Sequence, residues 1–110
     1  MTVLHMMFWL TVSHFAFDYP LQGDTTAIQK SPLCKNDLSK HVPWMYWLAA
    51  HCLMQAGGVV LITGNLGLGM VELVIHALTD YSKCRGWIGI HTDQAIHICC
   101  KVLYVCFMVL

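Results

Sequence analysis

Histidine and aspartate pairs with one shared spacing are the residues of this sequence best suited to chemistry. The pairs are His14 with Asp18, His76 with Asp80, and, in reverse order, Asp93 with His97. Residues four apart lie on one face of an α-helix, about one turn from each other, so each pair would present an imidazole and a carboxylate together. His51, inside another apolar stretch, adds a fourth imidazole. Such groups are suitable ligands for Zn²⁺, Mn²⁺ or Fe²⁺, and zinc is the default where no redox role is visible.

Four apolar stretches would carry these groups. They cover about residues 2–17, 44–63, 66–82 and 92–110. Each is near the roughly 17–25 residues that a helix needs to cross a bilayer. Hydrophobic residues make up 57% of the chain and charged residues 11%, whereas a soluble domain carries roughly a quarter charged residues. The sequence therefore predicts one all-α domain over residues 1–110: a four-helix transmembrane bundle with a polar link at 18–43 and a short interfacial helix after Asp24.

The direction of the chain predicts that all seven groups lie at one depth. The first and third stretches carry their groups at the end, and the second and fourth carry theirs at or near the beginning. Because consecutive helices alternate in direction, the groups fall in the same leaflet, within roughly 10 Å of depth at a rise of about 1.5 Å per residue. Ionisable residues in membrane helices are costly and usually functional. We therefore predict one metal-binding cluster near one membrane face, in which two ions share the seven groups or some groups orient the ligands.

The third and fourth stretches would form an antiparallel hairpin. In such a hairpin two residues on facing helices lie at equal depth when their numbers add up to the same total. The pairs that share one sum are His76 with His97, Asp80 with Asp93, and Glu72 with Lys101. The first two pairs build the predicted cluster. The third predicts an ion pair inside the membrane, which would offset the cost of burying either charge alone.

A short repeat suggests that the bundle consists of two similar hairpins. Residues 14–19 (His-Phe-Ala-Phe-Asp-Tyr) echo residues 76–81 (His-Ala-Leu-Thr-Asp-Tyr), and each segment is followed by a helix with one inward histidine, His51 or His97. Two hairpins with the same orientation would be related by an axis along the membrane normal. The metal would then lie between facing helices, as in other helix bundles.

The basic residues indicate an orientation and argue against one class of partner. Five of the six Lys and Arg residues lie in the two links at one end of the predicted bundle, at Lys30, Lys35, Lys40, Lys83 and Arg85. The positive-inside rule places both links in the cytoplasm and both termini on the opposite side. The net charge is zero and no run is dense in Lys or Arg, which argues against a nucleic-acid partner.

The order of these motifs resembles an uncharacterised bacterial and phage family of integral membrane proteins, classed as a domain of unknown function. The motifs that carry the resemblance are His14-x3-Asp18-x2-Leu21-Gln22, His51, His76-x3-Asp80-x2-Lys83 and Asp93-Gln94-x2-His97. The similarity spans nearly the whole chain and extends to Asp24, Ala27 and Lys30 in the polar link. That family has no established activity, but a broader set of small membrane proteins with His-x3-Asp helices is described as metal-dependent hydrolases. The resemblance implies a bacterial inner-membrane protein with periplasmic termini and metal-dependent hydrolase chemistry.

The first hypothesis is a membrane-embedded, metal-dependent hydrolase that acts on a phospholipid or a lipid-linked phosphoester near the cytoplasmic face. A bound metal can lower the pKa of a water molecule and polarise a phosphoryl or acyl oxygen. Asp93 would be a ligand or the general base, and Lys83, with Gln22 and Gln94 at the rim, would hold a substrate oxyanion. Membrane lipids are the expected partners, and a homo-oligomer is compatible with the sequence.

Three other interpretations stay open. The same groups suit a non-enzymatic, metal-stabilised interaction module, or one that moves ions or protons. The apolar helices would also suit a soluble helical oligomer. Finally, histidines and aspartates at helix ends often only cap helices, although His51 and His97 lie too far inside their helices for that.

Overall fold

The computed structural model describes all 110 residues and contains only helices. The six helices are α1 (Val3–Asp18), α2 (Gly23–Gln29), α3 (Asp37–His41), α4 (Trp44–Thr63), α5 (Leu66–Cys84) and α6 (Ile90–Val109). α1, α4, α5 and α6 are the four predicted apolar helices, and none of their ends lies more than two residues from the prediction. The polar link contains α2, which includes Asp24, and also α3, which the sequence analysis does not predict.

Local sequence signals determine where the long helices begin and end. The Thr2 hydroxyl accepts a hydrogen bond from the backbone amide of His5 at 3.2 Å, which caps the start of α1. Pro43 occupies the N-cap of α4, where its missing N–H leaves no donor unpaired. α4 ends at Gly64, whose φ of 68° is readily adopted by a residue without a Cβ. Asn65 then caps α5, so Gly64 and Asn65 form a tight turn between α4 and α5.

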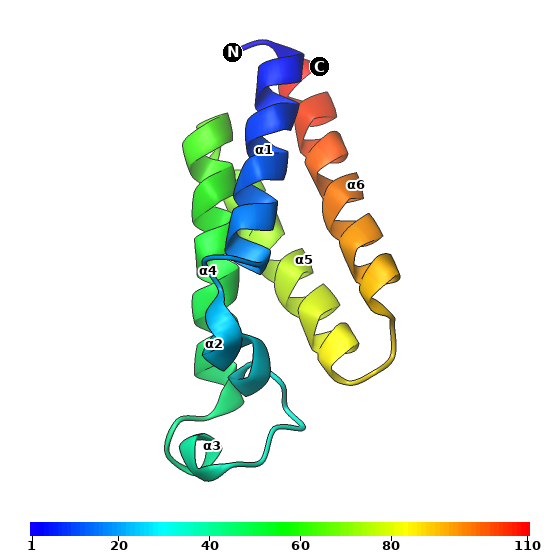
Figure 1. Ribbon diagram of the computed structural model, residues 1–110. Coiled ribbons are helices and arrows are strands. Elements are labelled where there is room, and N and C mark those ends of the chain that lie inside the picture. The colour runs from blue at the N-terminus through cyan, green and yellow to red at the C-terminus, as the bar shows by residue number, and fades with distance from the viewer.

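The four long helices pack in a closed ring in the order α1, α4, α5, α6. Figure 1 shows both chain termini at one end of the elongated molecule, and α2, α3 and the connection between α5 and α6 at the other end. The two basic links therefore share one end of the molecule, as predicted. Small residues let the helices approach closely: a Cβ at Gly58 would collide with the side chain of Ser13 in α1, and one at Gly69 would collide with Val60 in α4.

The interior of the molecule is more polar than its outer surface. Fourteen of the 26 buried residues are polar or charged. Large apolar side chains such as Leu61, Val74 and Leu103 instead face outward and are exposed. An apolar cluster that includes Leu10, Val59 and Tyr104 fills the part of the ring near the termini, and the polar groups fill the other part. This distribution is the reverse of that in a water-soluble domain, where polar and charged residues are mostly exposed.

Two of the four long helices, α4 and α6, have the length and apolarity to cross a membrane. α1 has only 16 residues. α5 carries three charged residues, Glu72, Asp80 and Lys83, along its length. The sequence analysis expects all four to span the bilayer; by length and composition, half of them qualify on their own.

Candidate metal centre

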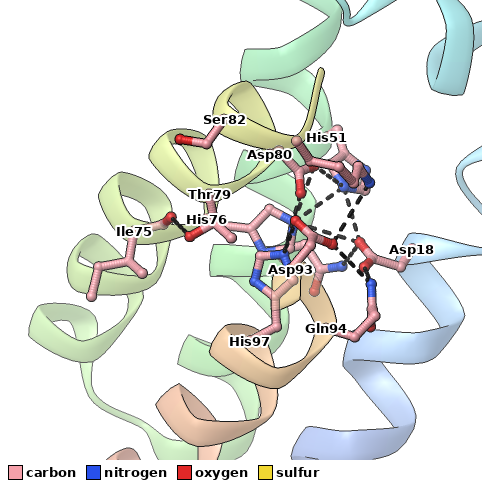
Figure 2. Close-up of polar contacts among 12 residues, drawn as sticks. Asp18, His51, Ile75, His76, Thr79, Asp80, Ser82, Asp93, Gln94 and His97 are labelled. Carbon is pink, nitrogen blue, oxygen red and sulfur yellow. Dashed lines mark hydrogen bonds and ion pairs between the residues drawn. The ribbon is translucent and has the colours of Figure 1, made fainter. Parts of the chain in front are cut away.

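All seven predicted metal-binding groups lie in one buried region enclosed by α1, α4, α5 and α6. The residues are His14, Asp18, His51, His76, Asp80, Asp93 and His97, and none is more than 6% exposed. Figure 2 shows His51, His76, Asp80, Asp93 and His97 converging with Asp18, although they come from different helices. The convergence predicted from helix direction is therefore present. The three histidines that the prediction leaves out, at positions 5, 41 and 91, are exposed.

Four of these residues bring one ligand atom each to a common centre. Nε2 of His51 lies 3.1 Å from Oδ1 of Asp18 and 3.2 Å from Oδ2 of Asp80. Nε2 of His76 lies 3.2 Å from Nε2 of His51 and 3.5 Å from each of the same two carboxylate oxygens. All four ligand atoms lie within 4.8 Å of one another. We refer to Asp18, His51, His76 and Asp80 as the tetrad.

The spacing of the tetrad fits a tetrahedral metal ion. Zinc binds imidazole nitrogen and carboxylate oxygen at about 2.0–2.1 Å, so the ligand atoms of a regular tetrahedron stand about 3.3 Å apart. The five separations given above lie between 3.1 and 3.5 Å. Two nitrogens and two carboxylate oxygens are also a donor set that zinc accepts. Both the chemistry and the spacing of the tetrad therefore suit a divalent cation.

The tautomer of His76 is set by Glu72. Nδ1 of His76 lies 3.0 Å from Oε1 of Glu72, and an ionised carboxylate can only accept, so Nδ1 carries the proton. Nε2 of His76 then faces Nε2 of His51 at 3.2 Å, a distance at which the two nitrogens can share either a proton or a cation. Glu72 also accepts hydrogen bonds from Nζ of Lys101 and from the hydroxyl of Tyr104, both at 2.7 Å. The predicted ion pair between Glu72 and Lys101 is confirmed.

A second set of groups lies next to the tetrad. Nε2 of His97 is 3.2 Å from Oδ1 of Asp80 and 3.3 Å from Oδ1 of Asp93. Oδ1 of Asp93 is buried and has no hydrogen-bond partner. The rings of His76 and His97, predicted to lie at equal depth, stack with their centroids 4.0 Å apart. Asp80 thus contacts both sets of groups, with one oxygen toward each.

Gln94 connects His14 to the cluster. The side-chain amide of Gln94 donates to Oδ2 of Asp18 at 2.9 Å and to Oδ2 of Asp93 at 3.1 Å, and these two acceptors fix its orientation. Oε1 of Gln94 must then accept from Nε2 of His14, at 2.9 Å. Nδ1 of His14 is left buried without a partner. Nε2 of His14 also lies 3.4 Å from Oδ2 of Asp18, and ring nitrogens of His14, His76 and His97 lie within 4.8 Å of one another. The role of His14 as a metal ligand stays a prediction.

The sequence analysis misses two contacts to the tetrad. The amide of Gln55 donates to Oδ1 of Asp18 at 2.9 Å, and its position four residues after His51 is the signal that could have identified it. Nζ of Lys30 donates to Oδ2 of Asp80 at 2.9 Å and to Oε1 of Gln22 at 2.6 Å. Lys30 is only 2% exposed. No helical spacing predicts this contact, because the lysine comes from the polar link.

An open cavity of about 330 Å³ lies beside the cluster. Asp18, Gln22, Asp24, Lys83 and Gln94 contribute the polar part of its lining. The three residues predicted to form a rim, at positions 22, 83 and 94, therefore do share one cavity. The cavity brings a ligand from outside to the edge of the tetrad, because Asp18 belongs to both.

No family model matches the chain, and no curated protein and no solved structure matches it either. The resemblance to a bacterial and phage membrane family stays a prediction. What the cluster can do therefore follows from the chemistry of its own side chains.

The charges around the tetrad favour a bound cation. Glu72 is neutralised by Lys101, with which it forms a buried ion pair. The three aspartates of the cluster are approached by only two lysines, since Lys30 contacts Asp80 and Lys83 lies 3.7 Å from Asp93. With neutral imidazoles the site carries one excess negative charge in a buried environment, where an unpaired charge is costly, and either a protonated histidine or a bound cation would offset it. A divalent cation offsets that charge and reverses its sign, which would in turn favour an anionic ligand in the cavity.

Proposed function

We propose that this chain is an integral protein of a bacterial inner membrane, in which the four long helices cross the bilayer as a bundle. Apolar side chains on the outside and charged side chains on the inside support this, because lipid tolerates ionisable groups mainly where they face the bundle interior. α4 and α6 qualify as spans by themselves, and α1 and α5 would insert by packing against them. By the positive-inside rule, the basic links would be cytoplasmic, which would put the cluster near the cytoplasmic face and the termini in the periplasm.

The tetrad binds a divalent metal ion, with zinc the best match to its donors and spacing. Glu72 orients His76, and Gln55 and Gln94 orient Asp18. Such outer partners fix ligand geometry and commonly determine affinity. Mn²⁺ and Fe²⁺ accept the same ligand types. Elemental analysis of the purified protein would therefore identify the bound metal.

The reaction that suits this centre best is metal-dependent hydrolysis of a lipid phosphoester. The observation that supports it is the cavity, because it joins Asp18 of the tetrad to Lys83 and Gln94. Lys83 would bind a phosphoryl oxygen by its charge, and the side-chain amide of Gln22 would donate a hydrogen bond to it. A bound metal supplies the remaining chemistry by lowering the pKa of a water molecule and polarising the phosphoryl oxygen. A site at headgroup depth would admit the phosphate of a lipid while its chains stay in the bilayer.

In a centre with one ion Asp93 suits the role of general base, whereas in a centre with two ions it would be a ligand. Its Oδ1 atom is buried and unpartnered, and its Oδ2 atom is held by the amide of Gln94 at 3.1 Å. A general base has to lie within hydrogen-bond reach of the proton that it removes. Asp93 lies between His97 and Lys83, which places it between the buried groups and the cavity.

The test is release of inorganic phosphate from phosphatidic acid in mixed micelles by the detergent-purified protein. We expect release that depends on added Zn²⁺ or Mn²⁺, that stops with a chelator, and that falls at least tenfold in Lys83→Ala. Lys35→Ala is the matched control, because Lys35 lies in the other basic link and is exposed. Absence of turnover in a folded, metal-loaded protein across several lipid phosphoesters would count against hydrolysis but not against the metal.

One observation favours a second candidate, a module that conducts protons or ions. The hydrogen-bonded groups do not stop at the cluster but continue from His76 through Glu72 to Lys101 and Tyr104, toward the end that holds the termini. Proton relays in membrane proteins use such chains of ionisable side chains. Zinc or proton flux into proteoliposomes, measured beside the phosphate assay, separates the two candidates.

A further inference from the structure

We propose that the centre holds two divalent cations, bridged by Asp80, with Asp93 and His97 as ligands of the second ion. This inference rests on the metal centre of the proposed function but does not depend on hydrolysis. It assigns a place to the groups that the tetrad leaves unused.

The two oxygens of Asp80 serve different neighbours. Oδ2 lies 3.2 Å from Nε2 of His51 and 3.5 Å from Nε2 of His76. Oδ1 lies 3.2 Å from Nε2 of His97. A carboxylate with imidazoles at both oxygens has the geometry of a bridge, and paired ions in such sites stand about 3.5–4 Å apart. Figure 2 shows His51 and His97 approaching Asp80 from different elements.

The second half of the site has its own ligands. Oδ1 of Asp93 lies 3.3 Å from Nε2 of His97, and with the 3.2 Å contact of His97 to Asp80 both separations match the roughly 3.3 Å edge of a zinc tetrahedron. Asp18 is within reach as well, because ligand atoms of Asp18, Asp93 and His97 lie within 4.8 Å of one another. The second ion would therefore have three or four protein ligands, with Asp80 shared.

Hydrogen bonds alone do not supply partners for all the buried oxygen atoms around the second position. Asp93 is fully buried, and its Oδ1 atom has no hydrogen-bond partner although its Oδ2 atom is held by Gln94. One N–H at Nε2 of His97 cannot serve the facing oxygens of both Asp80 and Asp93. An unsatisfied buried carboxylate oxygen is costly. A cation between Asp80, Asp93 and His97 removes that cost.

The second position also lies on the side of the cavity. Nζ of Lys83 is 3.7 Å from Oδ2 of Asp93, and Lys83 and Gln94 both line the cavity. An anionic ligand that enters there would lie next to both positions, because Asp18 of the tetrad lines the cavity and Lys83 and Gln94 both contact Asp93. Paired ions are typical of enzymes that displace groups at phosphorus, where they stabilise the attacking and the leaving oxygen. The ligand class that this arrangement would take is a phosphate ester.

Metal content per chain tests the inference directly. The detergent-purified protein is equilibrated with Zn²⁺, freed of excess metal and measured by elemental analysis against its amino-acid content. We expect two ions in the natural sequence, one in His97→Ala and two in His91→Ala. His91 is the matched control, since it lies in the same helix six residues earlier and is exposed. One ion in the natural sequence, unchanged in His97→Ala, would overturn the second site and leave the tetrad intact.

A measurement on the natural sequence keeps the test decisive if His97→Ala does not fold. Titration with Co²⁺, followed by electron paramagnetic resonance, should give a signal at the first equivalent that weakens at the second, because a bridging carboxylate couples the two ions. Two independent, additive signals would contradict a bridge. If no ion binds at all, the tetrad fails as well, whereas two bound ions without phosphate release would leave this inference standing and remove only the hydrolase.

Discussion

Glu72 accepts a hydrogen bond from Nδ1 of His76 at 3.0 Å, one helical turn away on the same face of α5. This contact connects the apolar end of the ring to the tetrad, because Glu72 is also held by Lys101. It fixes the tautomer of His76 and raises the basicity of the nitrogen that faces the centre. Glu72 thus forms an ion pair with Lys101 of α6 and also orients His76 of its own helix.

The first prediction concerns the change Glu72→Gln. It should weaken zinc binding by about 10- to 100-fold, the range typical for loss of a partner behind a histidine ligand. It should also destabilise the protein, because Lys101 is left as a buried charge without its partner, a loss of about 3–5 kcal/mol. Competition with a chromophoric chelator measures the affinity, and thermal unfolding in detergent measures the stability.

The double variant Glu72→Gln with Lys101→Met separates the two effects. With both charges removed, the stability should return toward that of the natural sequence, since apolar replacement of a buried pair is often neutral. The affinity for zinc should stay low, because His76 still lacks its carboxylate. If both properties recover together, the role of Glu72 is only structural.

The second prediction concerns Lys30, which holds the polar link against the site. Its ion pair with Asp80, at 2.9 Å, is buried on both sides. Lys30→Gln should loosen α2. A loss of ~1.4 kcal/mol of local stability would raise the fraction of molecules with a locally opened polar link about tenfold. Proteinase K should then cut residues 23–42 about tenfold faster. Lys35→Gln, at an exposed position, should leave the cleavage rate unchanged; equal rates in both variants would show that the contact does not anchor the link.

The third prediction concerns added metal. Zinc that binds only the folded protein should raise its free energy of unfolding by about 2.7 kcal/mol at a free concentration about 100 times Kd. His51→Ala should lower that increment, because it removes a tetrad ligand. His41→Ala should keep it, since His41 is exposed in the polar link. The comparison of each variant with and without zinc cancels the direct effect of the substitution on folding. An equal increment in His51→Ala would place the metal elsewhere.

The parts of this structure that sequence could predict are those governed by helical periodicity. The four apolar stretches gave helix ends within two residues, and spacing of four residues placed imidazoles and carboxylates on shared faces. The constant-sum rule for a hairpin also predicted the contact between Glu72 and Lys101, which lies at 2.7 Å. These contacts depend only on helix geometry and chain direction.

The contacts that sequence did not predict depend on the path of irregular segments and on the orientation of side chains between helices. Lys30 reaches Asp80 from a link whose path no periodicity fixes. His14 has the same spacing to its aspartate as His76 does, yet its Nε2 atom is held by Oε1 of Gln94 at 2.9 Å and lies 3.4 Å from Oδ2 of Asp18, outside the tetrad. Which side chain becomes a direct neighbour and which an indirect one is decided by packing between helices, and the i, i+4 pattern cannot distinguish them.

The fourth prediction compares two glycines in the interiors of α4 and α5. At Gly69 a Cβ would collide with Cγ2 of Val60 and lie 3.3 Å from the backbone oxygen of Ala56, so Gly69→Ala must push α4 and α5 apart. Val60 is β-branched and cannot easily rotate away, and overpacking of this kind costs about 1–3 kcal/mol. At Gly57 a Cβ would meet nothing within 4 Å, so Gly57→Ala should stabilise the helix by about 0.5–1 kcal/mol. Opposite shifts of the unfolding temperature in the two variants are the expected result, and a stabilising Gly69→Ala would contradict the close packing of α4 on α5.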